Sequence, residues 1–62
     1  PELVTHKGQE FNYCLEGLVK VVVGDSAYVL SPGDSLYFNP MIPHKMVTID
    51  DKPAKYITVI LL

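Results

Sequence analysis

Short runs of alternating apolar and polar residues make up most of this chain, and turn-forming residues separate one run from the next. No window keeps apolar residues at positions i, i+3, i+4 and i+7, so the pattern predicts no helix. Turn signals recur about every 8–12 residues, a spacing typical of β-sandwiches and barrels. The pattern predicts seven strands, over residues 2–7, 10–15, 18–23, 27–30, 35–38, 44–49 and 55–62. We therefore expect an all-β fold, an antiparallel barrel or jelly roll.

The residues between the runs predict turns of defined kinds. Gly24-Asp25 fits a two-residue hairpin turn, because glycine tolerates positive φ. Ser31-Pro32-Gly33-Asp34 fits a type II turn, in which proline fixes φ at the second position and glycine takes the left-handed third. The prolines within residues 39–43 exclude a strand interior there, because proline cannot donate to a ladder. Residues 50–53 predict the last turn.

Length and charge set outer limits on the function. The chain has 62 residues and a net charge of −2, with acids and bases scattered along it, which argues against a nucleic-acid-binding surface. We expect one domain over residues 1–62, taken from a longer polypeptide, because the chain begins at Pro1 and ends in an apolar run. The single cysteine excludes an internal disulfide. No signal peptide or bilayer-spanning run is visible, so we expect a cytoplasmic location.

The apolar runs at residues 19–23 and 57–62 contain few charges that would protect a free strand edge. A chain of this length buries only about 60% of its unfolded surface and is marginally stable alone. We therefore expect a homodimer, built edge to edge or sheet to sheet, or flanking strands that cover these runs.

The segment before residue 16 divides into two faces of different character. If no bulge intervenes at Gly8, strand alternation places one set of residues on a single face. This set mixes an imidazole, a carboxylate, an amide and a thiol. Its members are Val4, His6, Gly8, Glu10, Asn12 and Cys14. The opposite face carries Phe11, Tyr13 and Leu15, which we interpret as core or sheet packing. A polar set inside a barrel costs free energy unless a ligand, metal or water satisfies it.

Residues 4–17 resemble the first of two motifs of the cupin family, G-x5-H-x-H-x3,4-E-x6-G. Gly17 matches its last glycine, Glu10 its glutamate and His6 its second histidine. Val4 stands where the motif has its first histidine.

Residues 33–48 resemble the second cupin motif, G-x5-P-x-G-x2-H-x3-N. Gly33 and His44 match it. Asn39, Met41 and Thr48 stand where it has its proline, its second glycine and its asparagine. The resemblance implies a cupin-type β-barrel, also called a double-stranded β-helix.

In the cupin family, histidines and the glutamate bind one divalent ion inside the barrel. The resemblance therefore implies a metal site at His6, Glu10 and His44, for iron, manganese, nickel or zinc. Two histidines and one carboxylate form a chemically competent set with open positions. Simpler roles also remain open, because His6 fits a solvated strand end, Glu10 an edge carboxylate, and His44 a partner of the proline-rich loop.

We assign ligand binding to four further positions and a catalytic role to none. They are Asn12, Cys14, Phe38 and Met46. Asn12 shares its face with Glu10, and Met46 suits an adaptable apolar mouth. Cys14 and Phe38 equally fit packing roles, since the sequence gives Cys14 no neighbour that would activate its thiol.

Three functions follow from these features. The stretches 10–17 and 33–38, with Pro43-His44, resemble cupin domains that follow a helix-turn-helix in bacterial transcription regulators. This resemblance implies a dimeric sensor of a small molecule that makes no contact with nucleic acid or membrane itself. The alternative is a metal-dependent enzyme of the isomerase or dioxygenase type, using the two-histidine, one-glutamate site. A structural dimerisation barrel is the third candidate, and the polar face at Glu10 and Asn12 argues against it.

Overall fold

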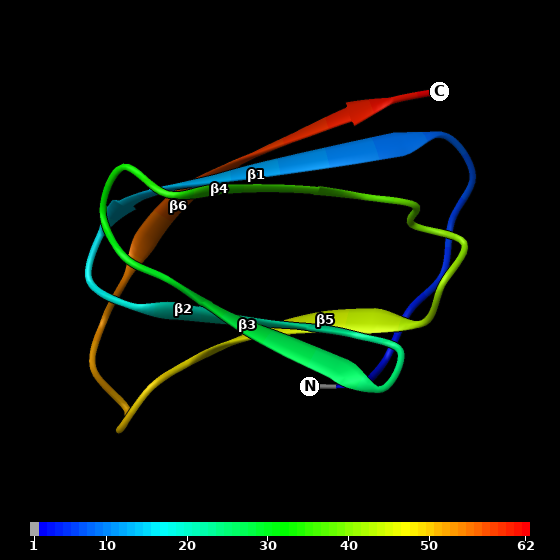
Figure 1. Cartoon of the computed structure of the whole chain (residues 1–62). Helices are drawn as coiled ribbons and strands as arrows, with labels where there is room; N and C mark the ends of the chain where they lie inside the picture. Colours follow the sequence, from blue (N-terminus) through cyan, green and yellow to red (C-terminus); the bar gives the residue numbers. More distant parts are fainter. Residues whose placement is uncertain (1) are drawn as a thin grey trace.

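A computed structural model describes residues 2–62 of the chain. Two three-stranded antiparallel sheets face each other as two layers (Figure 1). One sheet has the order β4-β1-β6 and the other the order β3-β2-β5. The strands are β1 (Gln9–Glu16), β2 (Val19–Val23), β3 (Ser26–Leu30), β4 (Ser35–Phe38), β5 (His44–Thr48) and β6 (Lys55–Leu61). The prediction of an all-β antiparallel fold is confirmed, and the described residues contain no helix long and apolar enough to cross a membrane.

The turn chemistry explains where several strands end. Asp34 donates its backbone N–H to the carbonyl of Ser31 at 2.9 Å, and Gly33 has a φ of 93°, as the type II turn requires. Gly24 has a φ of 58° in the hairpin between β2 and β3. Residues 39–43 form no strand, as their prolines predict.

The predicted strand over residues 2–7 is wrong. Only Val4 takes part in a β-bridge there, and its partner is His44 on β5. The chain bends at Lys7 and Gly8, so residues 2–6 lie beside one sheet while β1 belongs to the other. Gly8 has a φ of 98°, which residues other than glycine rarely adopt. A β-carbon there would lie 2.0 Å from the backbone oxygen of Leu61, so the close approach of the two segments requires glycine.

The hydrophobic core lies between the two sheets and is small. It consists of Cys14, Val19, Val21, Leu30 and Phe38, with Val23, Leu36, Met46 and Ala54 packed against it. Of the two interpretations of Phe11, Tyr13 and Leu15, core packing is wrong, since their exposed fractions are 39%, 37% and 45%. Alternation along β1 buries Glu10, Asn12 and Cys14 instead, so the apolar face of this strand points outward.

The sandwich is open along β6. All seven residues of β6 are exposed, although Tyr56, Thr58 and Ile60 are paired with the buried residues of β1 and share their face. The inner face of the β4-β1-β6 sheet is therefore incompletely covered at β6, although Glu10 and Asn12 on β1 stay buried.

Candidate metal centre

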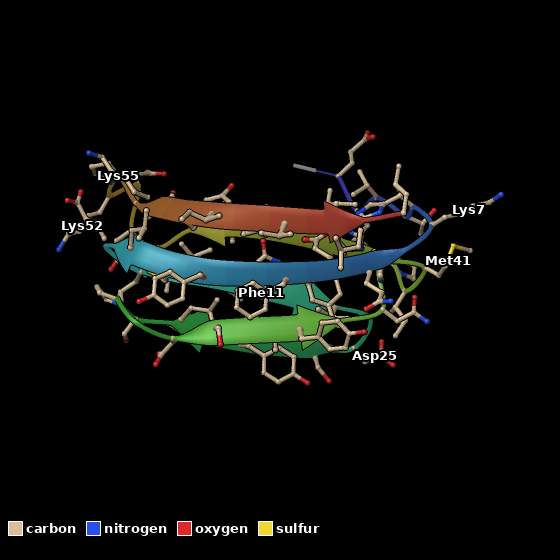
Figure 2. All side chains as sticks on the ribbon, turned by 90° about the horizontal axis from the view of Figure 1, so that it is seen from above. Lys7, Phe11, Asp25, Met41, Lys52 and Lys55 are labelled. Atoms are coloured by element: carbon tan, nitrogen blue, oxygen red, sulfur yellow. The ribbon has the colours of Figure 1, made fainter. Side chains whose placement is uncertain are left out.

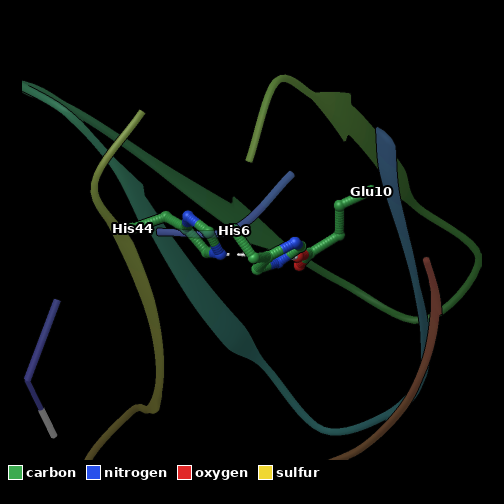
Figure 3. Close-up of side chains that lie close together, drawn as sticks. All are labelled: His6, Glu10 and His44. Atoms are coloured by element: carbon green, nitrogen blue, oxygen red, sulfur yellow. Dashed lines mark hydrogen bonds and ion pairs between the residues drawn. The ribbon is translucent and has the colours of Figure 1, made fainter. Parts of the chain in front are cut away.

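Three side chains from three segments converge inside the open side of the sandwich (Figure 3). His6 lies in the segment before β1, and its backbone N–H donates to the carbonyl of Pro40 at 3.1 Å. Glu10 is the second residue of β1. His44 begins β5, where its backbone exchanges two hydrogen bonds with Val4, of 2.8 and 3.0 Å. The loop before β5, the bend at Gly8 and strand β1 therefore position the three groups.

The distances from Oε1 of Glu10 to the two histidine rings fit a single metal ion. The Nε2 atom of His6 lies 2.8 Å from Oε1 of Glu10, and the Nε2 atom of His44 lies 3.4 Å from the same oxygen. All three ligand atoms lie within 4.8 Å of one another. Atoms that bind one ion at about 2.0–2.2 Å are about 2.8–3.6 Å apart at octahedral or tetrahedral angles. The two measured separations from Oε1 fall inside this range.

Backbone carbonyls fix the orientation of both imidazole rings. Nδ1 of His44 lies 2.8 Å from the carbonyl of Ile42, and Nδ1 of His6 lies 3.1 Å from the carbonyl of Lys7. A carbonyl only accepts, so Nδ1 carries a hydrogen in each ring. This tautomer directs both Nε2 atoms at Glu10, which is the arrangement that metal-binding histidines adopt.

The second carboxylate oxygen of Glu10 has a partner of its own. Asn12 donates its amide to Oε2 at 2.9 Å, and the hydroxyl of Thr58 on β6 donates to the amide oxygen of Asn12 at 2.6 Å. Glu10 and Asn12 are 3% and 0% exposed. None of the buried side-chain nitrogen or oxygen atoms in the described part of the chain lacks a hydrogen-bond partner. The polar face is thus internally satisfied.

His6 is the more accessible of the two histidines. Its side chain is 29% exposed, whereas that of His44 is 4% exposed and packs edge-on against the ring of Phe38. The hydrogen bonds to the Lys7 carbonyl and then to Glu10 raise the pKa of His6 above its usual value of 6.5. Protonated His6 and a metal ion therefore compete for the same oxygen of Glu10.

A pocket of about 400 Å³ opens beside the three groups, on the side of β6. Its walls combine apolar residues with polar ones. Besides His6, Glu10 and His44 they consist of Glu2, Val4, Lys45, Met46, Tyr56, Thr58 and Ile60. A larger cavity of about 490 Å³, at the opposite end of β5 near Ile49, has no histidine or cysteine among its described lining residues. The polar face of β1 belongs to the smaller pocket.

The structure separates the four residues that we assigned to ligand binding. Met46 lines the pocket. Asn12 is buried behind Glu10 and holds its carboxylate, and Phe38 packs on the ring of His44. The thiol of Cys14 is fully buried and donates to the carbonyl of Gly17 at 3.4 Å, away from the three groups.

Sequence reasoning missed three residues of the site. Thr58 completes the contacts of Asn12, and Tyr56 and Lys45 form part of the pocket wall. Strand alternation along the last strand places Tyr56 and Thr58 on one face, but only the pairing of β6 with β1 shows that this face meets Glu10 and Asn12.

A comparison with protein families gives a match over residues 1–60, to the family described as the cupin domain. The chain therefore belongs to the cupin family, and the resemblance noted from its two motifs is confirmed. Comparisons with curated proteins and with solved structures give no match. The six-stranded, two-sheet arrangement over residues 2–62 is the cupin sandwich that the family implies.

The residues present fit the divalent ion that many cupins bind. Two imidazole nitrogens and one carboxylate oxygen suit Fe(II), Mn(II), Ni(II) or Zn(II). Val4, where the family motif has a histidine, contributes only an apolar side chain to the pocket. The site therefore offers three protein ligands beside the pocket.

Proposed function

We propose that this cupin domain binds one divalent transition metal ion through Nε2 of His6, Oε1 of Glu10 and Nε2 of His44. The observation that carries the proposal is the convergence of these atoms around one carboxylate oxygen, with both Nδ1 atoms held by carbonyls. Each ring thereby directs an unprotonated Nε2 at the same point when the ion replaces the proton. Without an ion, the carboxylate and an imidazole must share a proton to avoid repulsion between lone pairs.

The ion and the adjacent pocket together bind a small molecule. Val4, Met46 and Ile60 supply apolar contacts, and Thr58 and Tyr56 supply hydroxyl groups. A mostly apolar pocket with a few polar groups is typical of small-molecule sites. A small acid, amine or sugar derivative with an oxygen or nitrogen donor fits this chemistry, since that donor can occupy a free position on the ion.

We assign the domain a sensor role, as the ligand-binding part of a longer, cytoplasmic transcription regulator. The support is the resemblance of the stretches 10–17 and 33–38 to such cupin domains. In this role the ligand binds without being converted, and a separate segment of the polypeptide contacts DNA.

A metal-dependent enzyme, of the isomerase or dioxygenase type, is the second candidate. The observation in its favour is that two histidines and one carboxylate leave positions free for substrate beside an open pocket. The ion, when bound, would supply Lewis-acid chemistry. The chain's own contribution would be to bind and orient the substrate through Tyr56 and Thr58.

Elemental analysis of protein purified without added metal tests the metal proposal. We expect about one equivalent of iron, manganese, nickel or zinc per chain, lost on His44→Ala. Lys20→Ala, an exposed change on the same sheet, serves as the control and retains the ion. Absence of metal from the wild-type protein, even after incubation with each ion, contradicts the proposal. Turnover of a bound small molecule by metal-loaded protein distinguishes the enzyme from the sensor.

We also propose that the outer face of the β4-β1-β6 sheet pairs with a second copy of the chain. Figure 2 looks onto this face, on which Phe11 is labelled. Its large side chains are paired across the strands and expose 37–63% of their surface; they are Phe11, Tyr13, Tyr37, Ile57, Val59 and Leu61. At about 150–250 Å² for a large side chain, together they expose on the order of 600 Å².

Two features favour a second copy as the partner on this outer face. A specific interface needs about 600–1,000 Å² from each partner, and the face reaches the lower end of this range. The outward residues in the middle of its strands carry no charge. The outer face of the other sheet, by contrast, carries Lys20 and Lys45. Two copies can therefore meet face to face without repulsion. Sedimentation equilibrium tests this, with a dimer expected and a monomer at micromolar concentration contradicting it.

A further inference from the structure

We infer that Asn12 and Thr58 act together as positioning residues, which hold Glu10 so that it offers a single oxygen to the ion. This inference rests on the metal site proposed above and adds a role for two residues that do not touch the ion. It concerns a chain of hydrogen bonds from β6 through β1 to the carboxylate.

The register of the sheet brings the two residues together. Asn12 on β1 and Thr58 on β6 are direct cross-strand partners, and Glu10 follows Asn12 on the same face. The Thr58 hydroxyl donates to Oδ1 of Asn12 at 2.6 Å, and Nδ2 of Asn12 donates to Oε2 of Glu10 at 2.9 Å. Asn12 is fully buried, so no water competes for its amide.

The chemistry of the three side chains determines which of them donates and which accepts each hydrogen bond. An ionised carboxylate only accepts hydrogen bonds, so Asn12 must turn its NH₂ group toward Glu10. Its oxygen then faces β6, where it needs a donor, because an unsatisfied buried carbonyl is costly. The hydroxyl of Thr58 is that donor. The reversed amide would place its oxygen against Oε2 of Glu10, with two acceptors in contact.

The consequence concerns how Glu10 binds. Oε2 is occupied by Asn12, and only Oε1 lies near the two Nε2 atoms, at 2.8 and 3.4 Å. Glu10 therefore binds through one oxygen and leaves the remaining positions on the ion free for a ligand. Thr58 also lines the pocket, so the chain of hydrogen bonds runs from the pocket wall to the carboxylate.

Titration with Co²⁺ tests the inference, because the visible absorption of Co²⁺ weakens as its coordination number rises. In Thr58→Val the amide loses its donor and releases Glu10, which then binds through both oxygens. We expect Co²⁺ affinity to fall about 10–100-fold, the usual effect of losing such a partner, together with a weaker visible band. Thr58→Ser keeps the hydroxyl and should retain both the affinity and the spectrum.

Thr48→Val is the matched control, because it makes the same change at an exposed position of β5. If Thr58→Val binds Co²⁺ with the affinity and spectrum of the wild-type protein, the inference is wrong while the metal site stands. If the wild-type protein binds no Co²⁺, the proposed function fails and the inference fails with it.

A measurement on the wild-type protein covers the case in which Thr58→Val does not fold. The side-chain NH₂ of Asn12 should exchange slowly with solvent in nuclear magnetic resonance spectra and shift when Zn²⁺ is added. Asn39 is exposed, so its side-chain NH₂ should exchange fast and serves as the comparison in the same spectrum. Equally fast exchange of the two amides contradicts the inference.

Discussion

The two faces of strand β1 reverse the usual distribution of polar and apolar residues. Its inner face carries Glu10 and Asn12, which are 3% and 0% exposed, and its outer face carries Phe11 and Tyr13, which are 39% and 37% exposed. In an ordinary two-layer sandwich the inner face is apolar and the outer face is polar. Burying the inner set costs free energy unless every group is paired, and exposing the outer set forgoes burial.

This reversal is the basis of the two binding roles that we propose for β1. The inner face is fully hydrogen-bonded and holds the proposed metal ligand, and the outer face is the proposed dimer contact. Folding relies on the small core of Val19, Val21 and their neighbours, which lie mostly on the other sheet. Single substitutions can test the two faces separately.

Glu10→Gln tests the inner face most severely. It keeps the size of the side chain but removes the charge that attracts the ion. Losing a residue that only hydrogen-bonds a metal ligand costs roughly 10–100-fold in affinity, so losing the charge of the ligand itself should lower the affinity for Zn²⁺ more than 100-fold. Isothermal titration calorimetry measures the change. Glu16→Gln, near the end of the same strand where the side chain is 67% exposed, is the control and should bind like the wild type. Equal binding by both variants contradicts the site.

Val59→Asp tests the outer face. In the proposed dimer it places two like charges near a two-fold axis, which costs several kcal/mol, so the dimer should weaken about 100-fold. Val29→Asp is matched to it, because both valines lie on edge strands and are 43% and 54% exposed. Sedimentation velocity should show a monomer for Val59→Asp and a dimer for Val29→Asp. If both variants remain dimers, a different surface forms the interface.

Gly8→Ala tests the bend that carries His6 to the inner face. Gly8 and Gly33 have similar φ angles, 98° and 93°, but only at Gly8 would the new β-carbon meet a backbone oxygen, at 2.0 Å. Gly33→Ala should lose about 1–2 kcal/mol of unfolding free energy from the φ angle alone. Gly8→Ala should lose more and also weaken Zn²⁺ binding. Chemical denaturation measures the unfolding free energy of the two variants. Equal losses in the two variants contradict the claim that the close approach of Gly8 to Leu61 requires glycine.

The stability of the protein should change with pH in opposite directions with and without metal. The pKa of His6 is raised by the Lys7 carbonyl and Glu10, so its charged form stabilises the metal-free protein below about pH 6.5. That contribution is lost as pH rises through the raised pKa. Metal binding needs the neutral ring, so affinity should fall up to tenfold for each pH unit below that pKa.

Thermal unfolding with and without Zn²⁺, at several pH values from about 6 to 9, measures both trends. His6→Gln should flatten the pH dependence of the metal-free protein. Parallel trends with and without Zn²⁺ contradict the competition between the proton and the ion at Glu10.

Alternation and turn residues were enough to predict six of the strands, because these signals are local. They failed for residues 2–7, where a run that looks like a strand is interrupted by the bend at Gly8 and pairs only at Val4. They placed Glu10 and Asn12 inside the barrel, where both are buried, but left open whether the opposite face of β1 belongs to a core. Hydrophobicity normally decides that question, and here it points the wrong way for Phe11 and Tyr13.

The site could be predicted only where spacing along the chain carried the signal. The motifs selected His6, Glu10 and His44, and the fold brings them together. Thr58 could not be found, because its contact with Asn12 joins residues 46 positions apart and depends on the pairing of β1 with β6. The ligand-binding assignment of Cys14 came from strand alternation, which does not say how far along a face the pocket extends.

An anomalous-scattering map from a crystal grown with Zn²⁺ would locate the ion directly and so test the metal site. We expect one strong peak about 2.0–2.2 Å from Nε2 of His6, Oε1 of Glu10 and Nε2 of His44. A map with no peak between these three atoms, or with peaks only on the exterior of the molecule, contradicts this expectation.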